Sequence, residues 1–213
     1  MGTPKDSLIT RSKIIQAAGR LFTDKGFKGV TVREISREAA VNLGALNYHF
    51  KSKEALYREV LLDACREAAI PEVDQAVLLS LPPEEALFTI IKEALTILRT
   101  DDTTHWQSAL LSRECREPSP VFDELTETYF KPQADFLVRI IAAAAGRLEA
   151  DMRVRLAGIS VVGLIETCGL YRRYTDAVAP GLTTYGDRDD WFAHMITRTI
   201  IHMAETTHME TDQ

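Results

Sequence analysis

The spacing of apolar and polar positions predicts helices throughout the chain. Apolar residues recur every three to four positions, as on one face of an α-helix, and no stretch shows the convincing period of two that marks a strand. Capping residues, glycines and prolines divide this pattern into about nine helices. They are expected over 11–22, 31–39, 42–49, from 53 onward, and over 84–98, 106–113, 119–144, 151–174 and 190–204. The sequence therefore predicts an all-α fold.

Prolines interrupt the helical pattern at two places. Pro71 and the Leu-Pro-Pro at 81–83 break the apolar period, which predicts a boundary or linker there. Pro132 lies inside a long periodic segment, where it removes one backbone hydrogen bond and crowds the preceding turn. We therefore expect a kink at Pro132.

The segment VNLGALNYHF at 41–50 places apolar and polar groups on different sides of one short helix. Leu46 and Phe50 are spaced to lock this helix onto a core, and polar side chains occupy the other side. A second short helix precedes it across a tight turn, and Thr31 and Glu34 give that helix a capping-box pattern. Two short helices arranged in this way form a helix-turn-helix, whose second helix lies in the major groove of DNA.

The charge distribution also favours a polyanionic partner for the first part of the chain. The formal net charge is −6, yet residues 1–53 hold ten Lys and Arg against four Asp and Glu, a net of +6. Residues 54–213 hold fifteen against twenty-seven, a net of −12. A basic head on an acidic body is expected where the head meets nucleic acid. The predicted domains are a three-helix DNA-binding head over 1–53 and a larger helical regulatory and dimerisation domain over 54–213.

The run TVREISREAAVNLGALNYHFKSKEALYREVL resembles the DNA-binding head of the TetR family of bacterial transcriptional regulators. The run LLSRECREPSPVFDELTETYFKP, at 110–132, is similar to the regulatory domain of the CecR-type subgroup. The resemblance implies that double-stranded DNA is a partner and assigns its contacts position by position. The implied DNA-binding residues are Thr31, Arg33, Asn42, Leu43, Gly44, Ala45, Asn47, Tyr48, His49 and Lys53.

Within this set the resemblance gives Tyr48 and His49 the role of gripping phosphates. Lys53 is expected to bind a phosphate too, since it begins a helix whose free N–H groups attract anions. Many family members have glycine where Ala40 stands, and a left-handed turn there would cost roughly 1–2 kcal/mol unless the turn is built differently. Many have tyrosine where Asn47 stands. Asparagine pairs bidentately with adenine, so Asn47 is expected to read a base.

The segment LAGISVVGLI, at 156–165, carries no charge on any face. A helix that is apolar all round is buried all round, so a second subunit is expected to cover the side that the protomer does not. A central core helix in a monomer is the alternative. The resemblance implies a homodimer joined by a four-helix bundle, which would bind a palindromic operator. The expected interface residues are Gly158, Val162, Gly163, Ile196 and Ile200.

The regulatory domain is expected to bind an apolar or aromatic small-molecule effector that releases the operator, as in a repressor. Aromatic and apolar side chains, one arginine and one carboxylate are the expected lining. They are Trp106, Leu110, Arg113, Phe122, Tyr129, Phe130, Glu166 and Tyr171. The alternatives are core packing for the aromatic residues and a solvated position for Glu166. For the whole protein, the alternative is a DNA-binding dimer without a small-molecule sensor.

Other classes of protein are disfavoured by motifs that the sequence lacks. It has no G-x-S-x-G elbow, phosphate-binding glycine loop or H-E-x-x-H, so we expect no enzyme activity and no cofactor. The histidines at 105, 194, 202 and 208 lack zinc-site spacing, so no metal is expected. No apolar run approaches the roughly 18 residues of a membrane span, and the start lacks the apolar stretch of a secretory signal. Three scattered cysteines argue against a disulfide framework. The expected location is the bacterial cytoplasm, and the nucleoid when DNA is bound.

Overall fold

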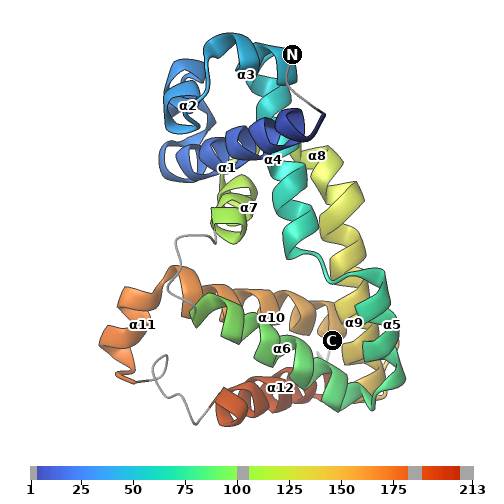
Figure 1. The fold of residues 1–213 in the computed structure, drawn as a ribbon. Helices are drawn as coiled ribbons and strands as arrows, with labels where there is room; N and C mark the ends of the chain where they lie inside the picture. The colour runs from blue at the N-terminus through green and yellow to red at the C-terminus, as the bar shows by residue number, and fades with distance from the viewer. Residues whose placement is uncertain (1–3, 100–105, 182–188, 207–213) are drawn as a thin grey trace, which may run out of the picture. The chain divides into compact units, whose positions relative to one another are not determined.

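The computed structural model describes residues 4–99, 106–181 and 189–206, and helices make up most of these ranges (Figure 1). No strand occurs in them, so the predicted all-α fold is confirmed. The chain forms two compact units. Unit 1 comprises Met1–Ala69 and Asp102–Tyr129, and unit 2 comprises Ile70–Asp101 and Phe130–Gln213.

Unit 1 contains the predicted head, but it extends beyond the expected boundary at residue 53, because α7 packs on both α1 and α4. Its core is built from apolar residues of the first four helices, among them Phe22, Ile35 and Leu46. The helices of unit 1 are α1 (Pro4–Gly29), α2 (Val32–Glu38), α3 (Leu43–His49), α4 (Lys53–Ala68), α7 (Trp106–Arg116) and α8 (Phe122–Leu125).

The first helix begins at Pro4, earlier than the expected start at residue 11. Its helical backbone is interrupted at Gly26, where φ is 70° and ψ is 169°. This conformation is open to glycine and strained for other residues. The predicted end of the helix at Gly26 therefore corresponds to this break, after which a short helical turn runs to Gly29.

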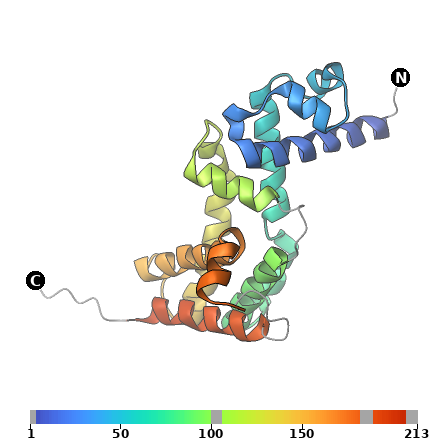
Figure 2. The ribbon, with the colours of Figure 1, turned by 90° about the vertical axis from the view of Figure 1, so that its left-hand side faces the viewer.

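Unit 2 has a core in which α6, α9, α10 and α12 pack on one another; α12, drawn in red, lies along α6 and α10 (Figure 2). The helices of unit 2 are α5 (Glu72–Ser80), α6 (Pro83–Arg99), α9 (Lys131–Ala145), α10 (Met152–Leu170), α11 (Arg172–Val178) and α12 (Asp189–Glu205). The sequence predicted a boundary or linker at Pro71 and 81–83, and the boundary between the two units falls between Ala69 and Ile70, directly before Pro71. The residues from 72 to 80 form α5 and are not a linker. Pro71 caps α5 and Pro83 begins α6, so these prolines start helices, a position where their missing N–H costs nothing.

The sequence predicted a kink at Pro132, and the structure has a π-helical turn directly before α9, the helix in which Pro132 lies. The π-helix η1 (Thr126–Phe130) lies between α8 and α9, and Pro132 falls in the first turn of α9. A π-helical turn contains an extra residue and bonds over five positions instead of four. The altered bonding precedes the proline, whose ring and missing N–H disrupt a regular α-helix at this position.

Candidate nucleic-acid interface

The start of α2 is fixed by the predicted capping box, which the structure confirms. The Thr31 hydroxyl accepts a hydrogen bond from the Glu34 N–H at 3.2 Å, and a Glu34 carboxylate oxygen accepts from the Thr31 N–H at 2.9 Å. The bond from the Thr31 backbone, helped by Lys25 at 3.0 Å, lowers the pKa of Glu34 to about 2. The Thr31 hydroxyl also donates a hydrogen bond to the Glu34 carboxylate at 2.9 Å. In this structure the contacts of the Thr31 side chain therefore serve to cap α2.

The turn between α2 and α3 has the left-handed conformation considered for Ala40, whose φ is 52°. Two hydrogen bonds close it: the Ala40 N–H donates to the Arg37 carbonyl at 3.1 Å, and the Val41 N–H donates to the Ser36 carbonyl at 3.0 Å. This pair of bonds defines a Schellman motif, which places a left-handed residue just after the helix end. The Ser36 hydroxyl adds a bond of 2.6 Å to the Val41 carbonyl. The turn thus keeps the left-handed geometry although alanine occupies it.

The third helix begins where the sequence predicted it, with Asn42 as its N-cap. The Asn42 side-chain oxygen accepts from the Ala45 N–H at 2.7 Å, so this oxygen holds the helix start. Gly44 leaves room for the cap, because a Cβ there would lie 3.2 Å from that oxygen. Leu46 and Phe50 are buried, as the apolar spacing predicted. Burial of this side fixes which face of α3 points outward.

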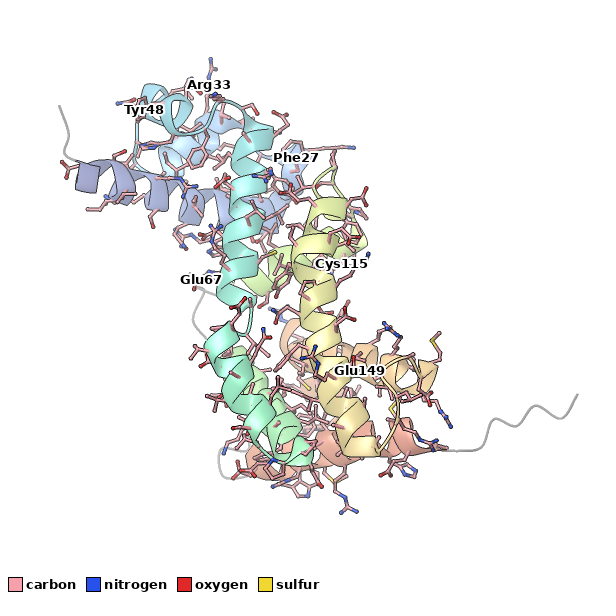
Figure 3. All side chains as sticks on the ribbon, turned by 90° about the vertical axis from the view of Figure 1, so that its right-hand side faces the viewer. Phe27, Arg33, Tyr48, Glu67, Cys115 and Glu149 are labelled. Carbon is pink, nitrogen blue, oxygen red and sulfur yellow. The ribbon has the colours of Figure 1, made fainter. Side chains whose placement is uncertain are left out.

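The outward face of the head carries most of the predicted contact residues. Arg33 on α2 and Asn47 on α3 are exposed, and the Tyr48 side chain is 81% exposed. The Tyr48 and His49 rings meet edge to face, with centroids 5.2 Å apart. Figure 3 shows Arg33 and Tyr48 at the outer surface of the head. Of the remaining members, Leu43 and Gly44 are exposed and Ala45 is half-buried.

Lys53 does not point its ammonium outward as a simple phosphate contact would. Its Nζ donates to the carbonyls of Phe27, at 2.9 Å, and Val30, at 3.1 Å. The same nitrogen lies 4.2 Å from the centroid of the Phe27 ring. The side chain is half-buried and joins the start of α4 to the end of α1.

The expected effector-lining residues do not gather within one unit. Trp106, Leu110, Arg113, Phe122 and Tyr129 belong to unit 1, whereas Phe130, Glu166 and Tyr171 belong to unit 2. Leu110 is fully buried, Glu166 is half-buried and Tyr171 is exposed.

Trp106 fits the alternative of core packing. It is buried, and its indole Nε1 donates to the Gln16 side chain at 2.9 Å. A Cβ built on Gly19 would lie 2.5 Å from the Trp106 ring, so the indole rests directly on the backbone of α1. The assignment of Trp106 to a pocket lining is therefore corrected, because its ring and its N–H are both used to attach α7 to α1.

A buried polar pair that sequence reasoning did not single out also joins α4 to α7. Glu114 is fully buried, and its carboxylate accepts from the Tyr57 hydroxyl at 2.8 Å and from the Ser119 N–H at 2.7 Å. Burial, together with this bond, raises the pKa of Tyr57. The Tyr57 ring packs edge to face on Phe22, with centroids 4.9 Å apart. A glutamate on an otherwise amphipathic helix gives no sequence signal of burial, so this pair could not have been predicted.

The expected dimer interface is partly wrong. Gly158 is buried, and a Cβ there would lie 3.3 Å from the Val138 side chain of α9, so it faces the protomer's own core. Ile196 and Ile200 are also buried in the core of unit 2. Val162 and Gly163 are exposed, as an interface position requires. The exposed large apolar residues on α10 and α12 are Met152, Leu156, Ile159, Val162, Leu164, Trp191 and Met195.

Two further properties concern the described ranges alone. No group of three or more His, Cys, Asp or Glu side chains in them has a geometry that could hold a metal ion. His105 and His208 lie outside those ranges. None of the described helices is both long and apolar enough to cross a membrane.

The capped pair α2 and α3, with one buried and one polar outward face, defines a helix-turn-helix DNA-binding regulator. Residues 14–60 match the family described as bacterial regulatory proteins of the tetR family. Residues 83–205 match the C-terminal domain of the HTH-type transcriptional dual regulator CecR. The chain belongs to the TetR family of transcriptional regulators, with a regulatory domain of the CecR type.

Relatives and solved structures agree with this assignment. The chain is 29% identical to CecR of Shigella flexneri over 73% of each protein. It is 30% identical to the HTH-type transcriptional repressor KstR2 of Mycolicibacterium smegmatis, over 72% of this chain and 75% of that one. The fold is similar to that of NalD, the secondary repressor of the MexAB-OprM multidrug efflux pump in Pseudomonas aeruginosa, with a TM-score of 0.63, 23% identity, and coverage of 93% and 97%.

Proposed function

We propose that the chain represses transcription as a homodimer that binds a palindromic operator. The observation that carries this proposal is the outward face of α3, where Asn47 and Tyr48 are exposed beside Arg33 on α2. One α3 helix contacts few base pairs. Two heads related by a two-fold axis would contact half-sites about 34–36 Å apart, which supplies the missing specificity.

The residues of this face divide into two kinds of contact. Asn47 is proposed to read a base, because its carboxamide matches the major-groove edge of adenine. Tyr48 and Arg33 are proposed to bind phosphates, which fixes the head on the duplex without selecting a sequence. The charge difference between residues 1–53 and the rest of the chain directs the head, and not the body, toward DNA.

Selection of bound duplexes from a random pool tests the proposal directly. The expected product is an inverted repeat. Asn47→Ala should then change base preference at one position of each half-site. Tyr48→Phe should instead lower the binding affinity for all DNA sequences by the same factor. Enriched duplexes without two-fold symmetry would contradict the palindrome, and equal behaviour of the two variants would contradict base readout by Asn47.

The exposed apolar residues of α10 and α12 are proposed to pack against a second copy of the chain. Ile159 is 71% exposed and lies one helical turn from Leu156 and Val162, so these residues form an apolar stripe. Monomeric proteins rarely leave contiguous patches of this kind in water. Ile159→Lys should produce a monomer in sedimentation at micromolar concentration. Leu148→Lys is the matched control, because Leu148 is 79% exposed but lies on the turn between α9 and α10.

We further propose that an apolar or aromatic small molecule releases the operator by favouring an arrangement that does not bind DNA. Coupling of this kind is reciprocal, so operator must lower effector affinity by the same factor. Titration of candidate compounds against free and operator-bound protein tests the idea. A compound that binds both forms with equal affinity would be excluded as the effector. The packing of Trp106 on α1 favours the alternative, a DNA-binding dimer controlled without a small molecule. A screen in which no compound changes operator affinity would support that alternative.

A further inference from the structure

We propose that Lys53 is a positioning residue that sets the entry of α2 into the head, and that it is not a phosphate contact. The proposal rests on the proposed function, because it concerns how the DNA-binding face is held. Its basis is the placement of one ammonium group between three helices. Nζ of Lys53, at the start of α4, donates to Phe27 in the last turn of α1 and to Val30 just before α2.

Both carbonyls lie where the chain changes direction. The segment follows the break at Gly26, where the backbone leaves the helical path, and ends at Thr31, the N-cap of α2. The last carbonyls of a helix lack donors from their own helix, so a lysine placed there supplies what the backbone does not. By bonding Val30, Lys53 also fixes the residue from which the capping box of α2 begins.

The electrostatic environment favours this position over an outward one. The ammonium lies near the C-terminal end of α1, where helix carbonyls attract a cation, and the face of the Phe27 ring, 4.2 Å away, attracts it as well. The start of its own helix repels it. To reach a DNA phosphate, Nζ would have to leave two carbonyls and the ring. An ammonium has three donors, and two of them are already used within the protein.

Phe27 extends the same contact into the core of unit 1. Its ring lies 4.9 Å from that of Tyr57, one turn along α4 from Lys53, and 6.2 Å from that of Phe22 on α1. Through Phe27, Lys53 therefore contacts a cluster of three aromatic rings, those of Phe22, Phe27 and Tyr57. Loss of the ammonium would loosen the 27–34 segment, and the orientation of α2 and α3 with it.

Lys51 provides a matched control, because it is a lysine two residues away whose side chain is exposed. We would compare the wild type with Lys53→Met and Lys51→Met. The probe is the duplex that wild-type protein enriches from a random pool, and affinity is measured between 50 and 300 mM salt. A dimer that loses one phosphate contact per head should show a salt slope smaller by about 1.8, since each contact contributes about 0.9. Amide exchange of residues 27–34 is measured separately on the free proteins.

For Lys53→Met we expect an unchanged salt slope, an affinity reduced by one factor at every salt concentration, and exchange at 27–34 at least tenfold faster. Lys51→Met should leave that exchange unchanged. A salt slope flattened by about 1.8 with unchanged exchange would overturn the proposal and restore Lys53 as a phosphate contact. If Lys53→Met did not fold while Lys51→Met did, the positioning role would be supported, since removal of an exposed contact changes stability little. If the wild-type protein bound no specific DNA sequence, the proposed function would be contradicted. Amide exchange in the free proteins would still test the positioning role of Lys53.

Discussion

Substitution of Ala40 by glycine should stabilise the helix-turn-helix. Ala40 has a φ of 52°, and the hydrogen bonds on both sides of it hold this conformation in place. A residue with a Cβ pays about 1–2 kcal/mol in the left-handed region. Glycine avoids this cost but loses about 0.5–1 kcal/mol more backbone entropy on folding. Because the Ala40 methyl is exposed, its removal sacrifices no buried contact. The expected net gain is about 0.5–1 kcal/mol.

The gain can be measured as a change in the urea midpoint with unchanged slope, or as slower amide exchange over residues 31–50. In thermal unfolding it corresponds to a rise of about 1–4 °C for a chain of this size. Ala39→Gly is the matched control, since Ala39 has a φ of −74° and is buried. Glycine there gains no relief of strain and loses both entropy and packing, so it should destabilise the protein.

The reasoning fails if Ala40→Gly proves neutral or destabilising while folding remains cooperative. It fails equally if both glycine variants shift stability in the same direction. Operator affinity provides an independent check on the same geometry. Because the turn already has its left-handed form, Ala40→Gly should leave the base preference of the head unchanged.

Three further substitutions test other contacts of unit 1. Gly19→Ala should destabilise the protein by about 1–3 kcal/mol in urea unfolding, because its Cβ would lie 2.5 Å from the Trp106 ring; a Trp106→Leu background should remove most of the loss. Tyr57→Phe should cost about 1–3 kcal/mol, since it removes a donor from the buried carboxylate of Glu114; unchanged stability would show that water replaces the hydroxyl. Glu34 has a folded pKa of about 2, below its ordinary value of 4.5, so its contribution is present above pH 4.5 and is lost as pH falls towards 2. Glu34→Gln should abolish that part of the pH dependence in thermal unfolding between pH 2 and 7, and a parallel curve for both proteins would contradict it.

The parts of the fold that were predictable are those encoded locally. Thr31 and Glu34 lie three residues apart, and a capping box needs only that spacing, so the start of α2 followed from the sequence. The same holds for Asn42 at the start of α3. α5 was missed for an instructive reason. A proline can end one helix or start the next, and the apolar pattern alone does not distinguish the two roles; here Pro71 is the N-cap of α5 and Pro83 begins α6.

Contacts between distant segments were not predictable in the same way. Lys53 looked like a phosphate ligand because it begins a helix in a basic head, and nothing local indicates that two carbonyls 23 and 26 residues earlier lie within reach. Trp106 looked like a pocket residue because it is aromatic and large. Its actual partner, Gly19, is recognisable only once α7 is known to pack on α1. Tertiary packing decides such roles, and local sequence does not contain it.

The prediction of the dimer interface partly failed for a related reason: the sequence did not show which face of α10 and α12 points away from the protomer's own core. Gly158 and Gly163 are five positions apart, and at about 100° per residue they point about 140° away from each other. They cannot both line one narrow contact, and the structure turns Gly158 toward Val138 and leaves Gly163 open. On α12 a shift by one residue has the same effect, because Ile196 and Ile200 are buried while Met195 and Thr199 are exposed.

In an uncharged stretch such as 156–165 every face of the helix is apolar, so the sequence does not indicate which face is buried within the protomer. A protomer can cover only one side of such a helix, and the side it leaves open is the one that needs a partner. The residues proposed to meet a second subunit should therefore be those adjacent to the buried set and not the buried set itself. On α12 this places Met195, together with Trp191 one turn earlier, in the contact that Ile196 and Ile200 were expected to form.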